Sequence, residues 1–161
     1  MPKHTLSVLV ENRAGVLNRV AGLFSRRGFN IDSLAVGVTE DPEVSRITIV
    51  VNGDDYIVEQ VCKQLNKLID VIKIKKLDDR DSVSRELALI KAGANASTRS
   101  EIAQLVEIFR AKIVDVSKTT LTIEISGDNE KVSAMEDMLK QFGIKEIVRT
   151  GAIAIERGNK Y

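Results

Sequence analysis

Apolar residues along this chain follow two kinds of spacing, one typical of strands and one typical of helices. The order of the segments with each spacing is the feature that most constrains the fold. Residues 5–10 and 44–52 are runs of apolar and β-branched side chains, and residues 31–39 alternate between their two faces, as strands do. Residues 15–27 instead repeat apolar side chains every three or four positions. That spacing predicts a helix with one apolar face, lying on a flat apolar surface.

A second helix and a fourth strand complete this half of the chain. Gly53-Asp54-Asp55 offers a helix start, and apolar side chains follow at helical spacing as far as Ile69. Residues 71–77 alternate again and predict a strand with an exposed, basic edge or face. The order is strand-helix-strand-strand-helix-strand, which is the split βαβ arrangement of ferredoxin-like domains.

The second half repeats this order without repeating the sequence. We expect strands at 85–92, 112–116, 121–126 and 145–149, helices at 97–110 and after Asp128, and a short edge segment at 151–155. Thr98 and Glu101 have capping-box spacing at the start of one helix, and Asp128 can cap the other.

The predicted fold class is therefore α+β, with two tandem ferredoxin-like (βαββαβ) domains. The expected boundaries are a first domain at 1–77, a charged linker at 78–84 and a second domain at 85–161. Two helices would cover only one face of each sheet, and the β-branched strands predict that the other face is apolar. Another copy of the same domain is the natural cover, so we expect a homodimer.

Charge and composition argue against several classes of partner. The chain has 24 Lys plus Arg and 23 Asp plus Glu, which gives no bulk attraction to nucleic acid or to acidic membranes. Residues 7–10 and 46–51 lack the aromatic side chains on which RNA-recognition domains stack bases. No apolar run approaches the span of a bilayer, and no signal-peptide-like segment follows Met1. We expect a cytoplasmic protein that binds neither nucleic acid nor membrane.

A single histidine, His4, and a single cysteine, Cys62, limit the chemistry that the chain can perform. A multi-His or Cys-based zinc site is not available, and a Ser-His-Asp arrangement would have to use His4 at the chain start. Cys62 falls on the apolar side of the second helix, so we interpret it as a small buried hydrophobe. Some ferredoxin-like domains hydrolyse acyl phosphates, but the glycine-flanked anion loop of that activity does not occur between Val8 and Leu17. We expect no catalytic residue and no metal site.

The segment from Asn12 to Leu17 joins the first strand to the first helix. Free backbone N–H groups at a helix start favour a carboxylate or phosphate, and Gly15 allows a ligand to approach the backbone closely. Asn12 offers both a donor and an acceptor to a polar ligand. Spacing alone nevertheless favours plainer roles: Asn12 as a helix cap, Gly15 as a turn residue, and Asn30 as a turn residue. The segment lacks the spacing of a phosphate-binding loop or dinucleotide fingerprint.

Taken together, these residues carry a resemblance to a known family. The segment ENRAGVLNRVAGLFSRRGFNIDSL, followed by SRITIVV and QLNKLIDVIKI, closely resembles the regulatory (small) subunit of acetolactate synthase. That family has an N-terminal ACT domain with the pattern Asn-x-x-Gly-x-Leu-x-Arg-Val, then Arg-Gly-Phe/Tyr-Asn-Ile. The resemblance covers the whole chain and is strongest over 5–52. Many ACT domains have Pro before this glycine, and Ala14 takes that place here, which leaves the loop less rigid.

The resemblance implies a non-catalytic subunit that associates with a large catalytic subunit dependent on thiamine diphosphate, Mg and FAD. The small subunit would hold no cofactor itself. It would activate the large subunit and make it sensitive to feedback by valine or a related branched-chain amino acid. The effector would sit between two ACT domains of a homodimer. An ACT-domain amino-acid sensor serving another enzyme would share this site, and a partner test separates the two.

The site residues that the resemblance assigns come from two chains. One chain would contribute Asn12, Ala14, Gly15, Val16 and Leu17, and the other would contribute Asn30 and Ile31.

Overall fold

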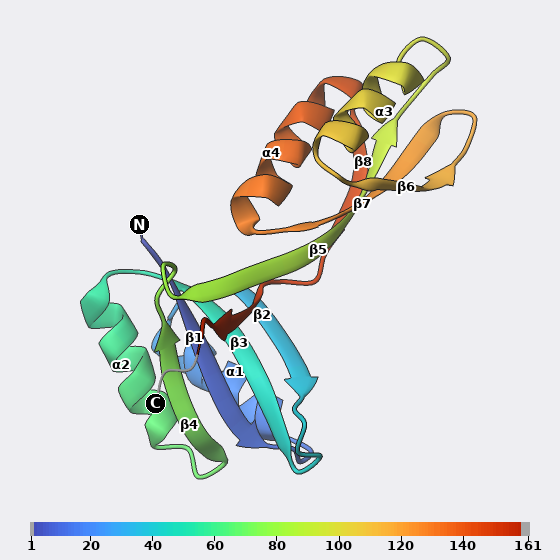
Figure 1. The fold of residues 1–161 in the computed structure, drawn as a ribbon. Helices are drawn as coiled ribbons and strands as arrows, with labels where there is room; N and C mark the ends of the chain where they lie inside the picture. The colour runs from blue at the N-terminus through green and yellow to red at the C-terminus, as the bar shows by residue number, and fades with distance from the viewer. Residues whose placement is uncertain (1, 159–161) are drawn as a thin grey trace. The chain divides into compact units, whose positions relative to one another are not determined.

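Each half of the chain builds an antiparallel sheet with two helices against one face, in a computed structural model that describes residues 2–158 (Figure 1). The first half contains β1 (Lys3–Glu11), α1 (Val16–Arg27), β2 (Ile31–Val38), β3 (Val44–Asn52), α2 (Asp55–Asn66) and β4 (Val71–Leu77). Its strands are ordered β2-β3-β1-β4, so that β2 and β4 are the outer strands of the sheet.

The second half follows the same plan. It contains β5 (Ser82–Gly93), α3 (Arg99–Ile108), β6 (Lys112–Val116), β7 (Thr120–Gly127), α4 (Asn129–Leu139), a 3-10 turn (Lys140–Phe142) and β8 (Ile144–Arg149), in the strand order β6-β7-β5-β8. A last strand, β9 (Ile153–Glu156), pairs with β5. The expected α+β fold of two βαββαβ units is confirmed.

Alternating strand residues and one stripe of each helix form a separate core in each half. The first core joins β1, β3, α1 and α2 through fully buried side chains such as Leu6, Val8, Val20, Ile49, Val61 and Leu65. The second joins β5, β7, α3 and α4 through Ile90, Ile102, Ile123, Met135 and Leu139. Because strand side chains alternate between the faces, only one face of each sheet supplies these residues.

Cys62 behaves as the sequence predicts. Its side chain packs, partly buried, against the first core. Burial raises the pKa of the Cys62 thiol, while the nearby charge of Lys76 acts in the opposite direction. Because the neutral thiol is favoured, Cys62 has the character of a small hydrophobe.

The expectation for Ile69 is wrong. The helical spacing predicted that it would share the apolar side of the second helix, but α2 ends at Asn66 and Ile69 is 92% exposed. A turn follows the helix, in which the Leu68 N–H donates to the Leu65 carbonyl. That turn carries Asp70 inward and Ile69 outward.

The predicted capping box at Thr98 is also replaced by another arrangement. The Thr98 side chain makes no capping hydrogen bond to α3. Instead, the Asn95 Oδ1 accepts the backbone N–H groups of Ser97 and Thr98 at 2.9 and 3.0 Å, in an Asx turn just before the helix begins. A hydroxyl-to-glutamate spacing cannot distinguish a cap from an Asx turn that lies just before it.

The chain divides into two compact units at places that differ from the expected boundaries. The second unit spans 84–151. The first unit contains the described residues up to Val83 together with those from Ala152 onward. β5 begins at Ser82, inside the segment expected to be a linker. The alternation of residues 151–155 predicts an edge strand, but periodicity does not say which unit that strand joins.

None of the helices within residues 2–158 has the length and hydrophobicity that a membrane-spanning helix needs.

Two aspartates cap equivalent helices in the two units and provide a test of the fold. Asp54 accepts the Ile57 N–H at the start of α2, and Asp128 accepts the Lys131 N–H at the start of α4, both at 2.9 Å. Asp54→Ala and Asp128→Ala should each cost about 1 kcal/mol of stability, since an orphan helix N–H loses its acceptor. Peptide-resolved hydrogen exchange should place the first loss in the first unit and the second loss in the second, so each variant is the control for the other. A loss shared equally by both units would contradict the separation into two cores.

Candidate functional site

The loop from Asn12 to Gly15 is held between two neighbouring turns of the first unit. The Asn12 N–H donates to the Glu43 carbonyl at 2.8 Å, and its side-chain Nδ2 donates to the Pro42 carbonyl at 2.9 Å. On the other side, the Glu11 N–H donates to the Asp70 carbonyl at 3.0 Å. Asn12 is therefore tied to the β2–β3 turn. The plainer interpretation of Asn12 as the cap of the first helix is wrong.

A buried carboxylate fixes this end of the unit. The Asp70 side chain is only 3% exposed, and it accepts from Arg13 Nη2 at 3.1 Å and from Arg19 Nε at 2.6 Å. Arg13 pairs with Glu11 as well. The two arginines and two acids balance in charge, so the loop, the first turn of α1 and the α2–β4 turn are joined without net charge. Neither Asp70 nor Arg19 was singled out from the sequence. The available signal was a charged residue between apolar Ile69 and Val71.

The start of α1 leaves backbone donors open. Gly15 occupies the N-cap position with φ 86° and ψ −13°, a left-handed conformation that favours glycine, and no side chain caps the helix. The first turn contains no acidic residue. The N–H groups of Leu17 and Asn18 have no acceptor within the helix, because the first turn of any helix lacks them. Together with the helix dipole, they favour a carboxylate at this point.

The neighbouring side chains add an apolar surface of limited size. Val16 is buried in the first core, whereas Leu17 is 43% exposed beside the loop. Ala14 is exposed and places only a methyl group there. This surface suits a small aliphatic group next to a carboxylate.

The second predicted segment follows the other end of α1. Asn30 is exposed, and its carbonyl accepts the Asn52 N–H at 3.3 Å. Ile31 is half-buried against the first core. Asn52 was not singled out from the sequence, yet its Oδ1 is buried and has no hydrogen-bond partner among the described residues. An asparagine at a strand end next to a glycine gives no distinct sequence signal.

One chain does not bring these two segments together. They flank α1, which is twelve residues long and so spans about 18 Å at about 1.5 Å per residue. A single amino acid is too short to touch both ends of that helix. If both segments bind one ligand, they must come from different chains.

The outer strand β2 offers a place where two chains can meet. It pairs only with β3 in the sheet order, and its exposed residues include Val36 and Val38. An apolar outer strand with an unpaired edge is a surface that proteins normally cover.

Removing the charge of Asp70 tests how far this end depends on it. Asp70→Asn should lower the free energy of unfolding by about 1–3 kcal/mol, because two charge-assisted hydrogen bonds weaken at a buried position. Chemical denaturation of the full chain measures the change, with the exposed Asp79→Asn as the control. Equal stability of the two variants would show that the arginines do not anchor the loop through Asp70.

Comparisons with known proteins agree along the whole chain. A family model described as the AHAS small subunit-like ACT domain matches residues 6–73, and one described as the small subunit of acetolactate synthase matches residues 85–158. A protein of Archaeoglobus fulgidus, called "probable acetolactate synthase small subunit", is 60% identical over 98% of this chain and 99% of its own length.

Two further relatives extend the agreement. The acetolactate synthase small subunit of Mycolicibacterium smegmatis is 57% identical over 98% of this chain and 92% of its own. The crystal structure of the acetolactate synthase small subunit from Thermotoga maritima has a TM-score of 0.91 at 47% identity, covering 99% of this chain and all of that one. The expected family is confirmed, and this chain belongs to the non-catalytic, regulatory small subunits of acetolactate synthase.

Proposed function

We propose that the chain binds valine or a related branched-chain amino acid between two copies of its first unit. In this state it controls a catalytic large subunit, which it activates and makes sensitive to feedback inhibition. The observation that carries the proposal is the uncapped, glycine-led start of α1 beside a small apolar surface. Membership of the small-subunit family supports the choice of partner.

Each part of an amino acid has a suitable counterpart in the two segments. The N–H groups at the start of α1 suit the carboxylate, and Leu17 with Ile31 of the other chain suits a branched aliphatic side chain. Because Nδ2 of Asn12 is engaged by Pro42, the side chain presents its Oδ1 to an ammonium group. Asn30 of the other chain adds a second amide.

The proposal assigns the cofactors of the reaction to the large subunit. Thiamine diphosphate, Mg and FAD would bind there, and this chain would act through contact with that subunit. The small subunit would work as a homodimer in the cytoplasm.

Thermal unfolding of the purified chain tests effector binding directly. Valine at about a hundred times its dissociation constant should add about 2.7 kcal/mol of stability and raise the melting temperature. Leucine and isoleucine rank the preference, and lysine at the same concentration is the control, because its charged side chain does not suit an apolar surface. No shift with any branched-chain amino acid would remove the effector site from the isolated chain.

Two substitutions at Gly15 separate charge from backbone strain. Gly15→Ala and Gly15→Asp both force a side chain into a left-handed conformation, and a Cβ there meets only the flexible end of Arg19 at 3.5 Å. Only Gly15→Asp adds an anion where the carboxylate should bind. We expect valine affinity to survive in Gly15→Ala, within about tenfold, and to be lost in Gly15→Asp, as measured by calorimetric titration. Equal affinity in the two variants would place the carboxylate elsewhere.

A further inference from the structure

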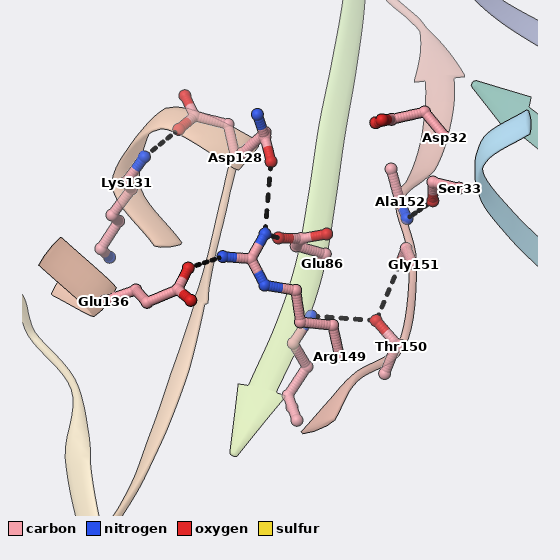
Figure 2. A network of polar contacts seen from close by, with 12 residues as sticks. Asp32, Ser33, Glu86, Asp128, Lys131, Glu136, Arg149, Thr150, Gly151 and Ala152 are labelled. Carbon is pink, nitrogen blue, oxygen red and sulfur yellow. Dashed lines mark hydrogen bonds and ion pairs between the residues drawn. The ribbon is translucent and has the colours of Figure 1, made fainter. Parts of the chain in front are cut away.

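The chain returns from the second unit to the first and crosses the face of the first sheet that the helices leave open. We call residues 152–157 the strap. At its start, the Ala152 N–H donates to Ser33 Oγ on β2 at 2.8 Å (Figure 2). Near its end, the Glu156 carboxylate pairs with Lys75 on β4, and the Arg157 N–H donates to the Asp81 carbonyl. β2 and β4 are the two outer strands of the sheet, so the strap spans it from edge to edge.

The distances along the chain fit this course. Strands about 4.8 Å apart place the outer strands of a four-stranded sheet about 14 Å from each other, and four extended residues reach about 13 Å. Figure 1 shows β9 in front of the sheet, with α1 behind it.

Strand pairing places both anchors on the open face. Ser33 lies opposite Val50, and Lys75 lies opposite Ser7, whereas the neighbouring Leu6, Val8, Ile49 and Val51 belong to the core beneath the helices. Thr48 and Val50 are only 3% and 8% exposed although they face away from the helices. Their burial requires a cover, and the strap is the segment anchored over that face.

The first anchor lies next to the proposed effector segment. Ser33 comes two residues after Ile31, and the pairing of β2 with β3 shifts register between Ile31 and Ser33. Such an irregularity leaves one residue outside the ladder and redirects its neighbours. A small movement of Asn30 and Ile31 can therefore change the position of the Ser33 hydroxyl without breaking the rest of the sheet.

The residues that directly precede the strap are held by hydrogen bonds within the second unit. Thr150 exchanges two hydrogen bonds with Leu87, from its N–H to the carbonyl at 3.0 Å and from the Leu87 N–H to its Oγ1 at 3.1 Å. Arg149 binds the buried Glu86 at 3.1 Å and Glu136 at 2.7 Å (Figure 2). Between Thr150 and Ala152 stands only Gly151, with φ 83°. One left-handed residue therefore separates the strap from the network around Arg149.

We propose that the strap couples effector occupancy at Asn30 and Ile31 to the second unit, with Ser33 and the Lys75–Glu156 pair as its positioning contacts. The inference rests on the proposed function, since it takes the effector segment from there. Coupling of this kind needs two arrangements that the effector stabilises unequally. The two arrangements would differ in the hydrogen bond between Ala152 and Ser33, whose length depends on the position of the start of β2.

Hydrogen exchange of the full chain, with and without saturating valine, tests the coupling, and calorimetric titration of the same samples gives valine affinity. In the wild type, valine should slow exchange of amides within 84–151 as well as around Asn30. The single variants Lys75→Glu and Glu156→Lys should each lose the valine-induced slowing of exchange within 84–151. Their valine affinity should stay within about fivefold of the wild-type value, which is below the usual range of allosteric coupling. The double variant Lys75→Glu with Glu156→Lys, in which the two charges are swapped, should restore this slowing. Lys73→Glu, on the same exposed side of β4, is the control.

Substitutions at Ser33 test the other anchor and guard against misfolding of the charge variants. Ser33→Ala should lose the transmitted change, and Ser33→Thr, which keeps a hydroxyl, should retain it. Wild-type transmission in Ser33→Ala or in Lys75→Glu would overturn the inference, as would valine binding to the wild type with no change within 84–151. Absence of valine binding to the wild type would refute the proposed function, and the inference with it. The titration identifies this last outcome separately from the others.

Discussion

The buried carboxylate of Asp70 is the interaction on which the candidate site depends most. It receives Arg13 from the loop and Arg19 from α1, at 3.1 and 2.6 Å, while its own backbone carbonyl holds the end of β1. An ionised group at 3% exposure is costly unless its oxygens are paired, so these contacts fix the three segments relative to one another. The same contacts hold the loop that leads into α1, where the N–H groups of Leu17 and Asn18 have no acceptor within the helix.

The same geometry divides the proposed site between two chains. The two segments flank a twelve-residue helix, so in the proposed dimer each chain would supply the loop of one site and the Asn30 segment of the other. The outer strand β2 lies directly after Asn30, so pairing of two chains along β2, as proposed, would also position the Asn30 segment. In this account an effector that bridges two chains stabilises one dimer arrangement over others, and the strap carries that preference into the second unit.

The spacing of residues in the sequence predicted the helices and strands of both units. It did not predict features that depend on contacts between residues far apart in the sequence. Both βαββαβ units followed from alternating and helical spacing. Gly53-Asp54-Asp55 was recognisable as a helix start, and Asp128 was recognisable as a cap. Ile69 was placed inward because its spacing fits the helix, but the helix ends earlier and Asp70 takes the inner position. The strap could not be assigned to the first unit, since its anchors Ser33 and Lys75 lie far away in sequence. The seven candidate site residues came from a family motif, and Asp70 and Asn52 lie outside that motif.

The most direct test of a site shared between chains is valine titration of a mixed dimer. One chain would carry Gly15→Asp and the other Asn30→Ala, each purified through its own tag so that only mixed dimers remain. If the two segments of one site come from different chains, one site in the mixed dimer keeps both segments intact and the other carries both substitutions. The mixed dimer should recover one valine site per pair of chains, at wild-type affinity, although neither parent dimer binds. A mixed dimer that also fails to bind would show that the loop of one chain and the Asn30 segment of the other do not form one site, and would contradict a site shared between chains.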